Sequence, residues 1–136
     1  MKDKIFVDTN IFVYAYTDGK IKKHEIAKEF LQDSRNTIVI STQVLSEFYS
    51  TLLKLDIEHN RAVFAIDEIL NYCIVESVNL KTVRVALALK KRYGFSYWDT
   101  LILSSALENN CKYLISEDMQ HNQMIDNSLT ITNIFV

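Results

Sequence analysis

The sequence predicts an α/β protein in which a parallel β-sheet is covered by helices on both faces. Short, almost wholly apolar runs alternate along the chain with longer segments whose apolar residues recur at a helical spacing. Such apolar runs are typical of parallel strands, which the connecting helices bury on both faces. Hydrophobic residues make up 49% of the 136 residues, enough for an ordered core. Because repeats and linker-like stretches are absent from the sequence, we expect one domain over residues 1–136.

Five strands and six helices are expected along the chain. The apolar runs predict strands at residues 4–7, 37–40, 73–78, 113–115 and 129–132. The segments between them predict helices at residues 9–16, 21–33, 42–54, 57–71, 80–92 and 95–110. The last helix is apolar around almost its whole circumference, Trp98 included, which indicates burial on several sides.

Polar residues that cap helices define several of these boundaries. The Ser-Thr pair at 41–42 can cap the third helix, and Asp56 can cap the fourth. Gly94 is expected to end the fifth helix. Ser96 and Asp99 fit the S-x-x-D capping box at the start of the sixth, so a purely structural role for Asp99 has to be weighed against a functional one.

Composition excludes several classes of site. With two glycines and no proline, the chain has neither a Walker phosphate loop nor a GxGxxG dinucleotide turn. Cys73 and Cys111 lie far apart, without the closely spaced ligands of a zinc site, and we expect both to be small buried hydrophobes. No apolar run approaches the ~20 residues of a membrane span, and no signal-peptide pattern opens the chain. We therefore expect a soluble, cytoplasmic protein with no membrane association.

The charge balance gives no overall attraction to nucleic acid, since the formal net charge is −2. Two local basic runs are typical of solvated helix faces and are also candidates for phosphate contacts. They contain Lys20, Lys22 and Lys23 in the first run, and Lys90, Lys91 and Arg92 in the second.

Four acidic residues are candidates for a site at one edge of the predicted sheet, where open parallel sheets bind ligands. Asp8 ends the first strand, and Asp118 follows the fourth. Asp99 opens the helix that leads into the fourth strand. Glu47 borders the apolar face of the helix after the second strand. Each also has a purely structural interpretation, as a helix cap, a turn residue or a solvated border residue.

Carboxylates gathered at one edge would repel one another, by about 4 kcal/mol per pair at 4 Å and an effective dielectric constant near 20. Such groups hold either protons or cations. A set of oxygen ligands without cysteine or histidine favours Mg²⁺ or Mn²⁺. Because Mg²⁺ in proteins is usually also coordinated by phosphate oxygens of the substrate, the pattern indicates phosphodiester or phosphoryl chemistry.

The four acids and their surroundings lie in five stretches that are spread over nearly the whole chain: "FVDTNIFVYAY", "ISTQVLSEFY", "SYWDTLILSSAL", "YLISEDMQHNQ" and "ITNIF". In these stretches the sequence resembles the PIN-domain ribonucleases, and in particular the VapC-type toxins of type II toxin–antitoxin pairs. The resemblance implies a PIN-like three-layer sandwich with a five-stranded parallel sheet. It also implies a Mg²⁺- or Mn²⁺-dependent endoribonuclease that a VapB-type antitoxin neutralises, usually as a homodimer.

The resemblance assigns roles to individual residues. The catalytic and metal-binding acids of the family fall on Asp8, Glu47, Asp99 and Asp118. Supporting polar positions fall on Thr9, Asn10 and Ser116. Glu117 is a further candidate ligand, although a solvated turn residue is the simpler interpretation.

Two residues depart from the family pattern. Asn122 stands where many relatives carry glycine, and Ile134 replaces the proline of a frequent "NPF" ending. Asparagine tolerates a left-handed backbone, so the loop around Asn122 is expected to be preserved.

Other functions remain open on the sequence alone. A response-regulator receiver is disfavoured because the third strand offers only Glu76 where an aspartate is needed. A histidine-pair ribonuclease is disfavoured because His24, His59 and His121 lie in unrelated segments. A PIN-like domain that binds RNA or protein without cleaving, and a PIN nuclease outside a toxin–antitoxin pair, both stay possible.

Overall fold

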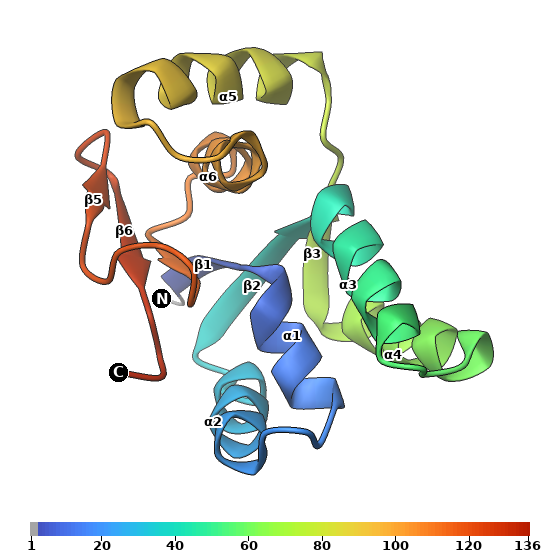
Figure 1. Ribbon diagram of the computed structural model, residues 1–136. Coiled ribbons are helices and arrows are strands. Elements are labelled where there is room, and N and C mark those ends of the chain that lie inside the picture. Colours follow the sequence, from blue (N-terminus) through green and yellow to red (C-terminus); the bar gives the residue numbers. More distant parts are fainter. Residues whose placement is uncertain (1–2) are drawn as a thin grey trace.

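The computed structural model describes residues 3–136 and contains a six-stranded sheet in the order β3-β2-β1-β4-β6-β5 (Figure 1). Five strands pair in parallel, and β5 pairs with β6 in the antiparallel sense. The bounds are Asp3–Val7 (β1), Asn36–Ser41 (β2), Cys73–Glu76 (β3), Tyr113–Ile115 (β4), Met124–Ile125 (β5) and Leu129–Thr132 (β6).

The five predicted parallel strands are confirmed, but the expectation of a five-stranded, wholly parallel sheet was wrong by one strand. The sequence analysis missed β5, which has only two residues and therefore no detectable periodicity. Asp126 and Asn127 follow it with φ angles of 49° and 56°, a left-handed backbone that reverses the chain into β6. Asn122 also adopts the expected left-handed conformation, with φ 68°.

All six predicted helices are present. Their bounds are Thr9–Tyr16 (α1), Ile21–Leu31 (α2), Thr42–Lys54 (α3), His59–Tyr72 (α4), Leu80–Tyr93 (α5) and Tyr97–Glu108 (α6). The side chains of Ser41 and Ser96 cap α3 and α6, and left-handed Gly94 ends α5. The prediction that Asp56 caps α4 was wrong. Its φ of 62° places it in the turn that ends α3, and Glu58 is the residue that precedes α4.

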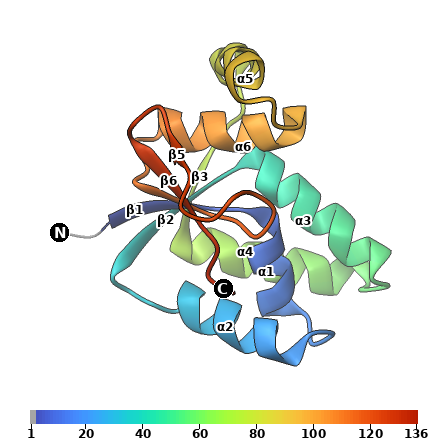
Figure 2. The same cartoon turned by 60° about the vertical axis from the view of Figure 1, so that its left-hand side comes forward.

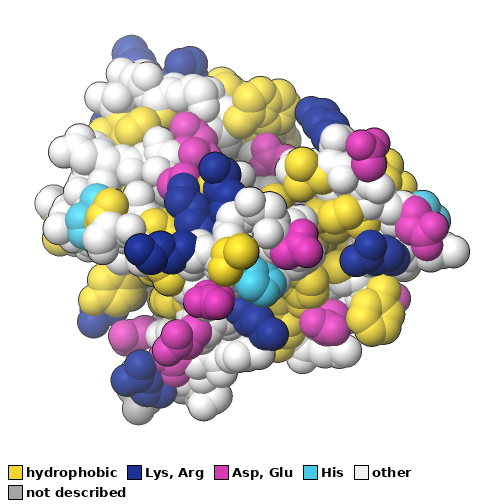
Figure 3. All heavy atoms as spheres, turned by 60° about the horizontal axis from the view of Figure 1, so that its bottom comes forward, with side chains coloured by type: hydrophobic (Ala, Val, Ile, Leu, Met, Phe, Trp, Pro, Cys, Tyr) yellow, Lys and Arg dark blue, Asp and Glu magenta, His cyan; other side chains and the backbone are white. Residues whose placement is uncertain are grey.

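The helices form layers on the two faces of the sheet. Figures 1 and 2 show α6 over one face with α5 outside it, and α1, α2 and α4 on the other side. None of the helices in residues 3–136 has the length and apolar character of a membrane span. On the face shown in Figure 3, basic and acidic side chains are interspersed rather than gathered into one charged field.

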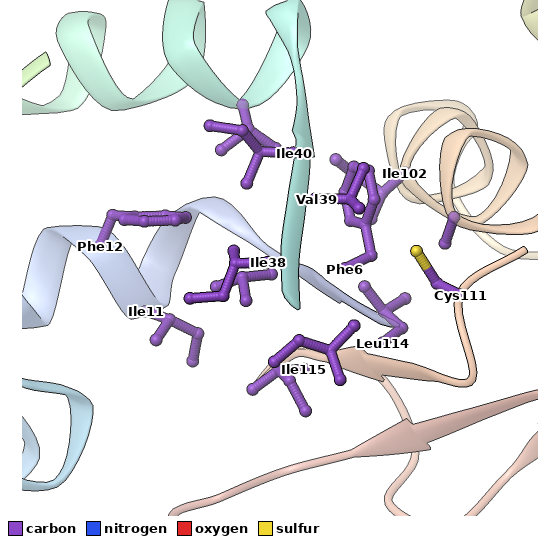
Figure 4. Close-up of a cluster of buried hydrophobic side chains, with 14 of the residues drawn as sticks. Phe6, Ile11, Phe12, Ile38, Val39, Ile40, Ile102, Cys111, Leu114 and Ile115 are labelled. Atoms are coloured by element: carbon purple, nitrogen blue, oxygen red, sulfur yellow. The ribbon is translucent and has the colours of Figure 1, made fainter. Parts of the chain in front are cut away.

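The core fills the space between the layers. Side chains alternate along β2, with Ile38 and Ile40 on the side of Phe12 from α1 and Val39 on the side of Ile102 from α6 (Figure 4). All five side chains are buried.

Helix α6 is buried without a break from Thr100 to Ala106, as its apolar circumference predicted. Trp98 departs from that prediction, because 62% of this residue is exposed. It lies in the first turn, before the helix enters the core.

The two cysteines behave as apolar residues. Cys111 is buried and Cys73 half-buried, and neither forms a disulfide. Burial raises the pKa of the Cys73 thiol to about 12 and that of Cys111 to about 11, so both stay neutral at physiological pH.

Candidate active site

The candidate site lies where the carboxyl ends of two adjacent strands meet. In the register of β1 with β4, Val7 is opposite Ile115, so the next residues, Asp8 and Ser116, leave the sheet side by side. The Asp8 amide donates to the Ile115 carbonyl at 2.9 Å, and the Ser116 hydroxyl donates to Asp8 Oδ2 at 2.9 Å. Sheet register thus joins two residues 108 positions apart in the chain.

Asp8 is almost fully buried and also caps α1, since its Oδ1 accepts from the Thr9 amide at 2.7 Å. Burial is the main reason why its pKa is raised from 3.8 to about 6. The bonds from Ser116 and Thr9 oppose this rise, and the nearby charges of Asp118 and Glu47 add to it. A cap and a functional carboxylate are therefore compatible in one residue.

The first turn of α1 orients two further acids. The Thr9 hydroxyl donates to Glu47 Oε1 at 3.0 Å, and Asn10 Nδ2 donates to Asp118 Oδ2 at 2.7 Å. The Asp118 amide in turn donates to the Ser116 hydroxyl at 3.2 Å. The three supporting positions, Thr9, Asn10 and Ser116, therefore each contact one of the candidate acids.

Asp99 reaches the same place from the opposite layer. Its amide donates to the Ser96 hydroxyl at 3.2 Å, which completes the N-terminal cap of α6 through the backbone rather than the Asp99 side chain. Asp99, Asp8, Glu47 and Asp118 together line one cleft of about 400 Å³. The pKa of Asp118 is raised by burial and then by the negative charges of Asp99 and Glu117.

The family assignment follows from a direct comparison. The family model described as PIN domain matches residues 5–125, which is most of the chain and includes all four acids. This chain belongs to the PIN domain family. A search of the curated proteins finds no match to this chain.

Solved structures with the same fold include known toxins. VapC20 of Mycobacterium tuberculosis, described as a Sarcin-Ricin loop cleaving toxin, has a TM-score of 0.71 and 22% identity over 84% of this chain and 91% of that one. A toxin–antitoxin complex from Klebsiella pneumoniae has a TM-score of 0.72 and 18% identity over 96% of this chain and 97% of that one. VapBC2 from Rickettsia felis, bound to a promoter DNA fragment, has a TM-score of 0.68 and 22% identity over 96% of this chain and 99% of that one.

The sequence analysis did not assign several of the residues that line the cleft of this PIN domain. Two of them carry side chains suited to binding a ligand, namely Lys54, from the last turn of α3, and Trp98, from the first turn of α6. A signal for Lys54 existed, because Glu47, Ser50 and Lys54 recur at intervals of three and four residues along one face of α3.

Three of the six basic residues named from the sequence have partners within the chain. Lys90 donates to the Phe95 carbonyl at 2.8 Å, and Arg92 forms an ion pair with Asp126 at 2.7 Å. Lys23 is paired with Glu117. Among the described residues that line the cleft, Lys54 is the only basic one.

Glu117 lies beside the cleft in a cluster with Lys23, Tyr14 and Phe135. Its Oε1 accepts from Lys23 Nζ at 2.7 Å and from the Tyr14 hydroxyl at 3.2 Å. The Lys23 ammonium lies 5.0 Å from the centre of the Tyr14 ring and 5.4 Å from that of Phe135. The expectation that Glu117 is a solvated turn residue was therefore wrong. Its side chain is only 23% exposed, and one of its oxygens is bound by Lys23 and by the Tyr14 hydroxyl.

The chemistry available in the cleft comes from carboxylate, hydroxyl and amide oxygens. No group of three or more His, Cys, Asp or Glu side chains within residues 3–136 is arranged so that it could hold a metal ion as it stands. Mg²⁺, however, binds proteins through one or two carboxylates and keeps several waters. The oxygen donors of the cleft fit that mode of binding.

Proposed function

We propose that this PIN domain is a divalent-metal-dependent endoribonuclease and the toxin of a toxin–antitoxin pair. The observation that carries the proposal is that Asp8, Glu47, Asp99 and Asp118, from four separate parts of the chain, line a single cleft. Asp8 and Asp118 have raised pKa values, mainly because of burial and in part because of the charges of other acids that line the cleft. A bound cation relieves such repulsion.

Asp8, Asp99 and Asp118 would hold Mg²⁺ or Mn²⁺, directly or through water, because hard cations prefer oxygen ligands. When bound, the ion would lower the pKa of a water molecule and stabilise charge on the phosphate oxygens. Ser116 and Asn10 keep Asp8 and Asp118 in position through the bonds described above.

Glu47 has a separate role in the proposed mechanism. The Thr9 hydroxyl holds one of its oxygens, and this fixes the carboxylate at the wall of the cleft. There it would orient the attacking water and accept its proton. Attack by water predicts products with a 5′-phosphate and a 3′-hydroxyl, without participation of the RNA 2′-hydroxyl.

The similarity of fold to VapC20 and to toxin–antitoxin complexes supports a VapB-type antitoxin as partner. A homodimer is the assembly that the resemblance to VapC-type toxins implies, and we include it in the proposal. The alternatives are an inactive PIN-like binding domain and a PIN nuclease without an antitoxin. The presence of all four acids in one cleft favours an active enzyme.

The test is to incubate total RNA with limiting protein, in Mn²⁺ or in EDTA, and to map the new 5′-phosphate ends. We expect Mn²⁺-dependent cuts at loops of one or a few structured RNAs, since sequence-specific RNA recognition usually targets unpaired loops. Ends scattered across most transcripts would contradict a specific toxin, and no cleavage in Mn²⁺ or Mg²⁺ would contradict an enzyme. Co-expression with the protein encoded by the adjacent gene tests the antitoxin.

A further inference from the structure

We propose that Trp98 forms a nucleobase-binding subsite at the rim of the acid cleft, which takes one unpaired base of an RNA strand by stacking. The inference rests on the proposed function for the identity of the nucleic acid. It goes further by naming the residue that binds a base.

The exposure of Trp98 is the first observation. This residue is 62% exposed, whereas the seven residues from Thr100 to Ala106 of the same helix are all buried. It directly precedes Asp99, and both line the cleft. A large apolar ring is therefore held open to solvent next to a candidate catalytic carboxylate.

The backbone of Trp98 is fixed in place. Gln43 Nε2, on α3, donates to the Trp98 carbonyl at 3.2 Å. The Ser96 hydroxyl caps the turn that contains it. The Tyr97 ring packs edge-on against the indole, with 5.4 Å between centroids and an interplanar angle of 67°. A ring supported in this way loses little conformational entropy when a base stacks on it.

The remainder of the cleft cannot supply such a contact. Among the described residues that line it, Trp98 is the only aromatic one, and the others are hydroxyl, amide, carboxylate and lysine side chains with Ile102. Acidic and basic side chains are interspersed on the face shown in Figure 3, and the net charge of −2 gives no overall field that would hold phosphates. Base stacking on aromatic rings is a usual source of affinity for unpaired RNA.

Helix α3 forms one wall of the cleft. Trp98 contacts this wall at Gln43, and Lys54 lies on the same helix eleven residues later. At 1.5 Å per residue the wall is roughly 16 Å long. A stacked strand carries a phosphate about every 3.4 Å, so the wall spans at most about five nucleotides. Glu47 lies between the two ends, so a strand stacked on Trp98 and bound to Lys54 by a phosphate would cross the acids.

Trp98 is the only tryptophan of the chain, so its fluorescence reports on this subsite alone. The probes are a single-stranded RNA decamer and a decamer of the same length with abasic positions, both titrated in EDTA so that no cleavage occurs. We expect the first to quench the fluorescence at saturation and the second to leave it unchanged.

Variants separate stacking from charge, with affinity measured by the anisotropy of a labelled decamer. Trp98→Ala should weaken binding about 5- to 150-fold, the range for loss of one stacked base, and Trp98→Phe should restore most of it. Lys54→Ala should weaken binding yet keep the full quench at saturation. Phe64→Ala removes a ring that is 70% exposed on α4 and should bind like the wild type.

Three results would overturn the subsite: equal quenching by both decamers, wild-type affinity of Trp98→Ala, or a fluorescence change that follows protein concentration without RNA. The last would assign the ring to contact with a second copy of the chain. Quenching by the decamer, with no cleavage of total RNA in Mn²⁺, would refute the proposed enzyme and support the subsite. Cleavage of total RNA by the wild type, with wild-type decamer affinity of Trp98→Ala, would support the enzyme and refute the subsite.

Discussion

Glu117 and Asp118 are consecutive in the chain, but their carboxylates lie in opposite electrostatic environments. Glu117 is paired with Lys23 at 2.7 Å and also accepts a hydrogen bond from the Tyr14 hydroxyl. Asp118 lines the cleft with three other acids, its oxygen is held by the neutral amide of Asn10, and its pKa is raised. The first region has its charge balanced within the chain, and the second does not.

This contrast separates a carboxylate that stabilises the structure from carboxylates that are available for a ligand. An ion pair within the chain removes the need for an external cation at Glu117 and holds the loop that carries Asp118. Acids that repel one another lower stability unless something else uses them, so a cleft of this kind indicates a binding or catalytic role.

The largest expected effect tests the unbalanced region. Asp99→Asn removes a charge from the cleft and should lower cleavage by about 10³-fold, the rate factor of about 4 kcal/mol. The fold should be unchanged, because the Ser96 cap uses the Asp99 amide. The measurement is single-turnover cleavage with circular dichroism of the same samples. The matched control is Asp67→Asn, an exposed acid on α4. If Asp99→Asn kept most of its activity, the Asp99 carboxylate would have no catalytic role, and only its backbone amide would serve the helix cap.

The second prediction concerns a variant that removes the cation paired with Glu117. Lys23→Met leaves Glu117 half-buried without its cation, next to Asp118. The displaced loop should lower cleavage between roughly 10- and 100-fold, the usual cost of misplacing a catalytic group by up to ~1 Å. The melting temperature should fall as well.

Charge removal distinguishes positioning from a direct role of Lys23. The double variant Lys23→Met/Glu117→Gln should regain most of the activity, since the unpaired charge is gone. If Lys23 bound RNA phosphate directly, the double variant would stay as weak as the single one. Arg35→Met breaks an exposed ion pair with Asp33 and should leave cleavage unchanged.

The smallest effect concerns stability in EDTA. The folded pKa of Asp8 is about 6 against 3.8, so the folded state keeps a proton that the unfolded chain releases between about pH 4 and 6. Wild-type stability should therefore fall across this window, by about 3 kcal/mol for a shift of this size. Asp8→Asn avoids that loss of stability, but its side chain accepts only one of the two hydrogen bonds that Asp8 accepts. The lost bond lowers the free energy of unfolding by about 1 kcal/mol.

The variant should thus be more stable than the wild type by about 2 kcal/mol above pH 6 and less stable below pH 4. Denaturant titrations across this range measure the crossing. Asp33→Asn gives the opposite trend, because Arg35 lowers the pKa of Asp33 to about 2 and the paired charge stabilises the folded state at neutral pH. A pH-independent difference for Asp8→Asn would show that burial does not perturb this carboxyl.

Local information was sufficient for most of the fold. The apolar strands and periodic helices were predictable because each depends on residues close together in sequence. Ser41, Ser96 and Gly94 acted at helix ends as expected for the same reason. Three local predictions were wrong, one of them the burial of Trp98, which is 62% exposed. Strand β5 is too short to show a period, and Asp56 is a polar residue whose backbone conformation the sequence does not specify.

The α/β class, the order of the elements and the four candidate acids were all predictable from the sequence. Which side chains contact one another depends on the tertiary structure. The β1–β4 register brought Ser116 to Asp8, and packing of α3 near α6 put Lys54 and Trp98 on the cleft of the acids. It also paired Lys23 with Glu117, 94 positions away. Contacts of this kind depend on how distant segments are placed in space, and neither periodicity nor capping patterns carry that information.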